Sequence, residues 1–162
     1  MRQIFPVHRP LLTVLFVLGL AVSATAQESV QITLPAAITF TASTTGAAAG
    51  TPAPTTVTFS NAVLITGRVL RISVMADSAS FTGPDGTSVP SSLVSWTVSN
   101  ASGGTASSGT LSASSYTQVF QSNVLTASGG LDIDWTLASV AGVSRAGTHT
   151  VNLRWKLEAV FP

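Results

Sequence analysis

Two aspartates, Asp132 and Asp134, are the first residues of this chain whose type and spacing suggest chemistry. They lie two positions apart in the segment L-D-I-D-W-T-L. On a β-strand such residues share one face and lie about 6.5–7 Å apart, which is the lower end of the carboxylate spacing in inverting glycosidases. Glycosidase carboxylates flank a substrate across a cleft, whereas these two stand side by side on one strand. We therefore expect a solvated strand face that carries no catalytic residue.

The same two carboxylates are candidate oxygen ligands for a hard cation such as Ca²⁺. A calcium site needs about six oxygen ligands, and no other acidic cluster lies nearby in the sequence. The alternative is that the two aspartates pair with Arg154 and Lys156 on a neighbouring strand. We predict no metal site, and whether Asp132 and Asp134 bind a cation is left open at this point.

His149 is the only histidine beyond residue 26, and the chain contains no cysteine. A general base needs a nucleophile and an orienting carboxylate beside it, and no G-x-S-x-G segment supplies the nucleophile. One histidine without cysteine is too few ligands for a zinc site, and there is no glycine-rich phosphate loop. We expect no enzyme activity and no cofactor, with His149 at the start of a strand on the rim of the domain.

The first 26 residues have the pattern of a secretory signal peptide. Arg2 and Arg9 form its basic start, residues 11–22 are an apolar run, and Ala24-Thr25-Ala26 is a small-residue cleavage site. The run is shorter than the about 20 apolar residues that a membrane-spanning helix needs. We expect cleavage after Ala26 and no membrane span afterwards. Residues 27–162 would form one secreted domain at the cell surface or outside the cell, with the periplasm as the alternative location.

Charge and composition exclude several classes of partner. Without Arg2 and Arg9, five basic residues face six acidic ones, a net charge of −1. The few charges are scattered along the sequence, so we expect no binding to nucleic acid. A domain of this length buries enough surface to fold without disulfides.

Apolar and polar residues alternate in many segments after residue 27, which is the pattern of β-strands with one buried face. The clearest example is residues 151–159, and similar segments are Val57–Phe59, Leu70–Ala76, Val94–Val98, Tyr116–Phe120 and Leu131–Leu137. No helical period is present. We predict about seven to nine strands in an antiparallel two-sheet β-sandwich, with an immunoglobulin-like or pilin-like Greek key as the leading topology and a jelly roll as the runner-up.

The segment Val30–Ala42 shows the longest alternation, interrupted by Pro35. Proline cannot donate to a strand ladder, so this is an edge strand or a strand broken in two. The segment either pairs within its own domain, which closes the shorter loop, or leaves it and completes the sheet of a second copy. After it, Ser43–Thr56 is a low-complexity segment rich in turn formers, and we expect a flexible loop there.

Trp96, Trp135 and Trp155 all fall on the core-facing positions of predicted strands. Large aromatic side chains dominate sandwich cores. We therefore expect the three indoles to fill the core. Stacking on a sugar would require them to face water.

The end of the chain resembles the C-terminal signature of the WxL surface domain. The resemblance lies in A-G-T-H-T at residues 146–150, in Leu153, Trp155 and Leu157, and in Trp135-Thr136-Leu137 as the upstream Trp-x-Leu. His149 replaces the usual tyrosine. A similar turn before a last strand is found in spore-coat-U and pilin-like secreted domains. The resemblance implies an exported bacterial surface domain and, for the WxL family, non-covalent attachment to the cell wall.

These observations predict a non-enzymatic, secreted, structural or adhesive protein of the cell surface. Its expected partner is a second copy of itself, through strand donation or edge pairing by Val30–Ala42. The alternative is a module that binds polysaccharide or peptidoglycan.

Overall fold

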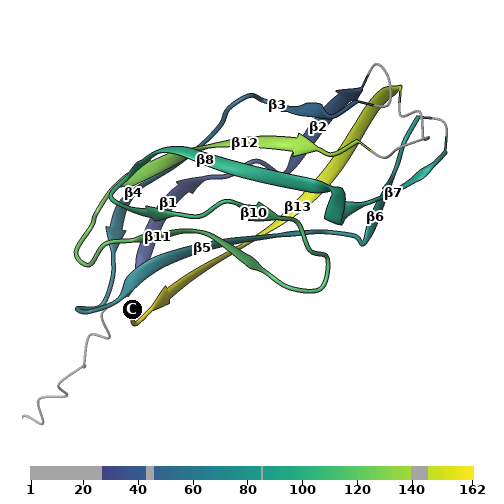
Figure 1. Ribbon diagram of the computed structural model, residues 1–162. Helices are drawn as coiled ribbons and strands as arrows, with labels where there is room; N and C mark the ends of the chain where they lie inside the picture. The colour runs from purple at the N-terminus through teal and green to yellow at the C-terminus, as the bar shows by residue number, and fades with distance from the viewer. Residues whose placement is uncertain (1–26, 43–45, 85, 140–145) are drawn as a thin grey trace, which may run out of the picture.

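The computed structural model describes residues 27–42, 46–84, 86–139 and 146–162, and the chain there is all β (Figure 1). The predicted signal peptide lies outside the described residues. One three-residue 3-10 helix, η1 (Ser91–Leu93), interrupts the strands. The strands are β1 (Ser29–Thr33), β2 (Ala37–Ala42), β3 (Ala48–Thr51), β4 (Thr55–Val63), β5 (Val69–Ala76), β6 (Ser80–Thr82), β7 (Ser88–Pro90), β8 (Val94–Ser102), β9 (Gly104–Ala106), β10 (Gly109–Thr110), β11 (Thr117–Ser122), β12 (Gly129–Leu137) and β13 (Gly147–Val160).

Eleven of these strands form one continuous antiparallel sheet, and β6 and β7 form a separate hairpin. The order through the large sheet is β1-β4-β12-β3-β2-β13-β5-β11-β9, with β8 added on β12 and β10 on β8. The all-β antiparallel fold is confirmed. The prediction of two separate sheets is not, because β3 pairs with both β12 and β2 and thereby joins the strands into one sheet.

The structure has more strands than the alternating pattern predicts. The additional ones are β3, β6, β7, β9 and β10, each of only two to four residues. Strands of this length carry too few side chains to show a two-residue period. The longer strands β4, β5, β8, β11, β12 and β13 lie where the alternation predicts them.

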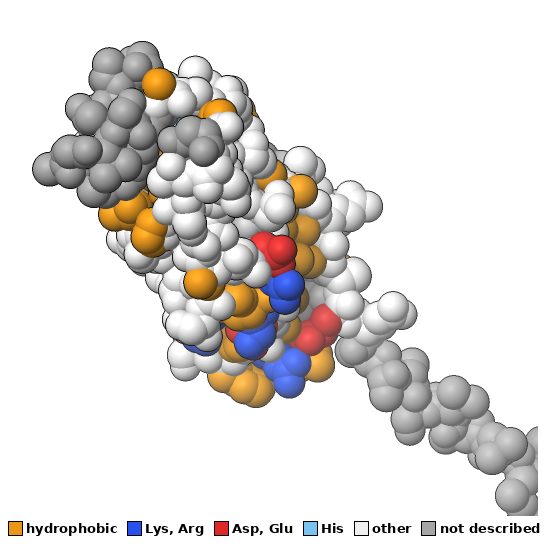
Figure 2. All heavy atoms as spheres, turned by 90° about the vertical axis from the view of Figure 1, so that its right-hand side faces the viewer, with side chains coloured by type: hydrophobic (Ala, Val, Ile, Leu, Met, Phe, Trp, Pro, Cys, Tyr) orange, Lys and Arg blue, Asp and Glu red, His pale blue; other side chains and the backbone are white. Residues whose placement is uncertain are grey.

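The large sheet bends so that strands far apart in its order face each other across a hydrophobic core. Phe59 on β4 and Phe120 on β11 show this directly, since their ring centroids lie 5.5 Å apart. Trp96 and Trp135, on the paired strands β8 and β12, lie in the same core with ring centroids 5.6 Å apart. On the face that Figure 2 shows, charged side chains are few and lie close together.

The predicted first strand is broken in two at Leu34, Pro35 and Ala36. The first piece, β1, is the edge of the large sheet and pairs only with β4. The second piece, β2, lies inside the sheet between β3 and β13. Both outcomes expected for a proline here are found, because the strand is broken and its first piece is an edge strand.

The predicted flexible loop over Ser43–Thr56 contains β3 and the start of β4, so this expectation is wrong for residues 48–51 and 55–56. Residues 43–45 lie outside the described part. The small side chains of β3 have a structural role. A Cβ on Gly50 would lie 2.7 Å from Trp135 Cβ and 2.8 Å from Ile38 Cγ2. Only a residue without a side chain lets β3 pass this close to the core.

The last strand, β13, has a buried face over its first half, at His149, Val151 and Leu153. Burial fades along the second half, where Trp155 is half-buried and Leu157 is 39% exposed. His149 was expected on the rim of the domain and is instead 1% exposed. The reason is its parity, because it shares the strand face of Val151 and Leu153.

Candidate functional site: an open groove between the first and last strands

The second half of β13 has an edge without a strand partner. Successive residues of a strand direct their backbone groups to opposite edges. Leu153 N–H donates to Ala36 O on the β2 side (2.8 Å), and Asn152 O accepts from Asp77 N–H on the β5 side (3.0 Å). The backbone groups of Trp155, Leu157 and Ala159 therefore point to the β2 side. Within the described ranges no strand pairs there, because β2 ends its ladder at Asn152.

The free edge of β1 borders the same space. β1 uses one edge to pair with β4, and in the described part of the chain its other edge has no strand neighbour. A groove of about 240 Å³ lies between the start of β1 and the end of β13. Its lining is mostly aliphatic: Val30, Leu64, Leu70, Leu157 and Ala159, with Glu28, Ser29 and Glu158 at the margin.

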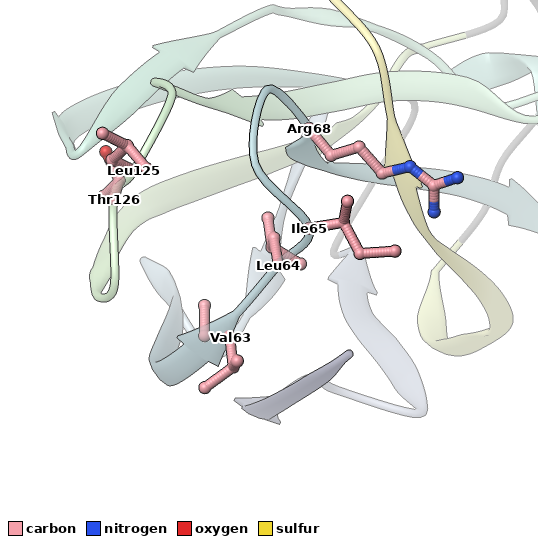
Figure 3. Close-up of a pocket in the computed structure, with 7 residues that line it drawn as sticks. Val63, Leu64, Ile65, Arg68, Leu125 and Thr126 are labelled. Atoms are coloured by element: carbon pink, nitrogen blue, oxygen red, sulfur yellow. The ribbon is translucent and has the colours of Figure 1, made fainter. Parts of the chain in front are cut away.

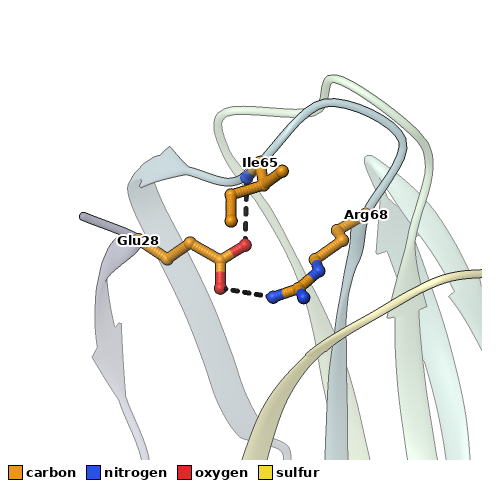
Figure 4. Close-up of polar contacts among 3 residues, drawn as sticks. All are labelled: Glu28, Ile65 and Arg68. Carbon is orange, nitrogen blue, oxygen red and sulfur yellow. Dashed lines mark hydrogen bonds and ion pairs between the residues drawn. The ribbon is translucent and has the colours of Figure 1, made fainter. Parts of the chain in front are cut away.

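An ion pair between Glu28 and Arg68 lies at the end of the groove where β1 begins. Glu28 Oε2 accepts a hydrogen bond from Arg68 Nη1 at 3.0 Å, and Glu28 Oε1 accepts one from Ile65 N–H, also at 3.0 Å (Figure 4). Both side chains are partly exposed, and exposed ion pairs stabilise by about 0–1 kcal/mol. The pair therefore serves mainly to fix the start of β1 against the β4–β5 loop.

Trp155 precedes the groove residues of β13 by two positions. Its Nε1–H donates to Pro35 O at 2.7 Å, across the break between β1 and β2. The groove itself has Glu28 of the ion pair in its lining and a free strand edge along each side. At the ion-pair end a second hollow opens between the β4–β5 and β11–β12 loops (Figure 3).

The geometry of this groove is suited to an extended peptide. Unpaired backbone groups along two strand edges offer ladder hydrogen bonds, and the aliphatic floor accepts every second side chain of an incoming strand. No nucleophile or base takes part in this chemistry. The sequence did not reveal the site, because its residues come from β1, the β4–β5 loop, β5 and β13, and only strand pairing brings them together.

Asp132 and Asp134 lie on the polar face of β12, away from this groove. Asp132 is held by two hydrogen bonds, from Thr56 Oγ1 to Oδ1 at 2.7 Å and from Asn100 Nδ2 to Oδ2 at 2.8 Å. Asp134 is exposed opposite Thr97. The expected pairing with Arg154 and Lys156 is wrong, because β12 and β13 are not neighbours.

Those two basic residues instead meet other carboxylates. Arg154 pairs with Asp77 across the adjacent β5 end, and Lys156 pairs with Glu158 on its own strand at 2.8 Å. Among the described residues, no group of three or more His, Cys, Asp or Glu side chains converges as a metal site would require.

The hydrogen bond from Asn100, and then that from Thr56, lower the pKa of Asp132 below its ordinary value of 3.8. We expect Asn100→Ala to raise this pKa more than Thr56→Val does, because the Asn100 bond is the larger cause. Carboxyl carbon chemical shifts followed through an acid titration measure both changes. The folded-state pKa is depressed, so the contribution of Asp132 to stability is present above its unfolded pKa and is lost as pH falls through the folded value. Equal pKa values in the two variants would contradict the assignment.

His149 is packed inside the domain against the β6–β7 hairpin. Its ring lies edge-on to Phe81 with centroids 6.1 Å apart. Asp132 and Asp134 project from the polar face of β12, whereas His149 belongs to the buried face of β13. The residues that suggested chemistry in the sequence are therefore not brought together.

All three tryptophans follow their predicted parity, and Trp155 is the least buried of them. Trp96 and Trp135 are 1% and 2% exposed, and their Nε1–H groups donate to Ser107 O and Thr55 Oγ1. Trp155 is half-buried and packs against the margin of the same core. The two fully buried indoles are inaccessible to a sugar.

No family model matches this chain, and no curated protein or solved structure is similar to it. None of the helices in the described part of the chain is long and apolar enough to span a membrane.

Proposed function

We propose that this protein is a non-enzymatic, exported structural subunit of a bacterial cell surface that assembles through strand pairing at the groove between β1 and β13. The observation that carries the proposal is the pair of free strand edges on either side of an aliphatic floor. Free edges of this kind are a template for a further strand from another chain. Export is supported by the signal-peptide pattern of residues 1–26.

We further infer that the bent sheet is a pilin-like or immunoglobulin-like sandwich whose two layers are linked through β3. The contact between Phe59 and Phe120 supports two facing layers, because their strands are far apart in the sheet order. A sandwich that lacks a strand between its first and last strands leaves a core groove open. The resemblance of residues 146–162 to exported surface domains agrees with this assignment.

The incoming strand is proposed to be apolar at every second residue, because the groove lining is aliphatic. The segment Ser29–Leu34 of a second copy meets that requirement with Val30, Ile32 and Leu34. In its own domain β1 is five residues long, pairs with one strand and is only partly buried. A strand with these properties exchanges between copies at low cost. When β1 leaves its place beside β4, the groove widens to the space between β4 and β13, and β1 of the next copy fills it.

The assembly is tested by size-exclusion chromatography and electron microscopy of the exported protein over a range of concentrations. We expect polymers or oligomers for the natural chain and monomers for Leu157→Lys, which puts a charge into the groove from a 39% exposed position. The same substitution at Thr97, on the exposed face of β8, is the matched control and should leave assembly intact.

Excess peptide with the sequence of residues 29–34 should occupy the groove and shorten the polymers. A natural chain that stays monomeric at high concentration, without any polymer, would refute the assembly. Polymers that form equally well in Leu157→Lys would place the interface elsewhere.

A further inference from the structure

The end of the molecule beside Glu28 carries a cluster of exposed aliphatic and aromatic side chains, which we call the apolar pole. It consists of Val63, Ile65, Leu125 and Phe161, which are 58%, 41%, 83% and 65% exposed. The first three line one hollow of about 200 Å³ between the β4–β5 and β11–β12 loops (Figure 3). Arg68 also lines this hollow, and its guanidinium lies 5.2 Å from the ring centroid of Phe161, which places Phe161 beside the other three residues.

Leu125 is the most informative residue of the pole. It is the most exposed large hydrophobic residue of the described chain, and its φ of +62° lies in the left-handed region. Asparagine or glycine would suit both the backbone and the solvent better there. A leucine at this loop tip is costly in water, so its side chain is best explained by an apolar surrounding that it enters.

We propose that the apolar pole contacts a lipid bilayer and seats the folded domain against the membrane. Val63 and Ile65 come from the end of β4 and the loop after it, Leu125 from the β11–β12 loop and Phe161 from the end of the chain. Such a surface fits a soft apolar phase better than it fits a flat, closely packed protein partner. Glu28 and Arg68 border the pole and form an ion pair at 3.0 Å, so these two charges neutralise each other there.

The position of the pole in the chain gives a reason for choosing lipid over a second copy. The predicted apolar run ends at Val22, and five residues separate it from Glu28 at the pole. Fully extended, that link spans about 20 Å. Until the expected cleavage after Ala26, the pole is therefore the end of the domain nearest the membrane that holds the run. This inference goes beyond the proposed assembly and does not depend on it.

The test uses the exported protein, without residues 1–26, in phosphatidylcholine–phosphatidylglycerol vesicles, so that the predicted apolar run cannot itself bring the label to the lipid. Because the chain has no cysteine, Asn123→Cys beside Leu125 takes one fluorescent label. Ser88→Cys, in the β6–β7 hairpin at the opposite end of the molecule in Figure 1, takes the control label. We expect lipid-borne quenchers to reach the label at residue 123 and not the one at residue 88.

Adding Leu125→Asn to the labelled protein should lower the ratio of lipid-bound to free protein about tenfold. Asparagine tolerates the left-handed backbone, so folding is preserved, which near-ultraviolet circular dichroism checks. Val63→Thr, which keeps the strand and the side-chain shape, should act in the same direction.

A label at residue 123 that stays as open to aqueous iodide as the one at residue 88 would overturn the proposal. Protection of residue 123 without vesicles, increasing with protein concentration, would overturn it in favour of a second copy. The groove variant Leu157→Lys should keep full lipid contact, which separates this result from the fate of the assembly proposal.

Discussion

Trp135→Ala is expected to lower the free energy of unfolding by about 3–5 kcal/mol, the usual loss when a large buried aromatic side chain is truncated in a core. Trp135 is 2% exposed and lies in the middle of β12, which pairs with β3, β4 and β8. Its indole packs on Trp96 and donates to Thr55 Oγ1 at 3.2 Å. The truncation therefore removes ring burial, a ring contact and a hydrogen bond at the point where three strands meet.

Urea denaturation followed by circular dichroism measures the loss. Small domains are stable by about 5–15 kcal/mol in total, so the change takes away a large fraction. Trp155→Ala is the matched control, because the same indole is only half-buried at that position. The control should lose clearly less. Equal losses at the two positions would contradict the full burial of Trp135 and the partial burial of Trp155.

Gly104→Ala is expected to destabilise the protein by about 1–3 kcal/mol, the typical cost of overpacking. Gly104 starts β9 at the edge of the large sheet, and a Cβ there would lie 2.2 Å from Gln121 O and 2.7 Å from Ser122 Cα. These atoms belong to the backbone of β11, which is fixed by its pairing with β5. The strand β9 would have to move away from its partner.

Gly86→Ala separates this steric cost from the cost of backbone conformation. No atom lies within 4 Å of a Cβ at Gly86, but its φ is +81°. Its loss should therefore reflect the left-handed backbone alone, about 1 kcal/mol. Thermal unfolding of both variants gives the comparison. A Gly104→Ala protein as stable as the natural chain would show that β9 is not packed on β11 as described.

The sequence predicted the long strands well because each buries one face. In β12, for example, Leu131, Ile133 and Trp135 are buried while Asp134 is exposed, and this alternation is legible without a structure. The strand β3 was missed for the opposite reason. Its residues are alanine, glycine and threonine, and their small size lets the strand pass close to Trp135. In the sequence, a run of such residues has the composition of a loop.

The candidate site was beyond the reach of sequence analysis for a different reason. A groove between Val30 and Leu157 depends on which strands fail to pair, and pairing partners are not encoded in a two-residue period. Pro35 did indicate that the first strand breaks. It did not indicate that the two pieces would pair with β4 and β13 and leave free edges between them. His149 is buried because it shares a strand face with Val151 and Leu153. The alternation in the sequence already indicated this, but the expected rim position did not take it into account.

The arrangement of β13 also bears on when the protein can fold. β13 is the last of the strands to leave the ribosome, and its 14 residues pair with β2 along the first half and with β5 along the second. Until β13 emerges, the strand that lies between β2 and β5 in the sheet is missing, and these two strands are not connected to each other. The nascent chain would then stay loosely structured throughout most of its synthesis. That is the state in which a polypeptide passes through a narrow export channel most readily.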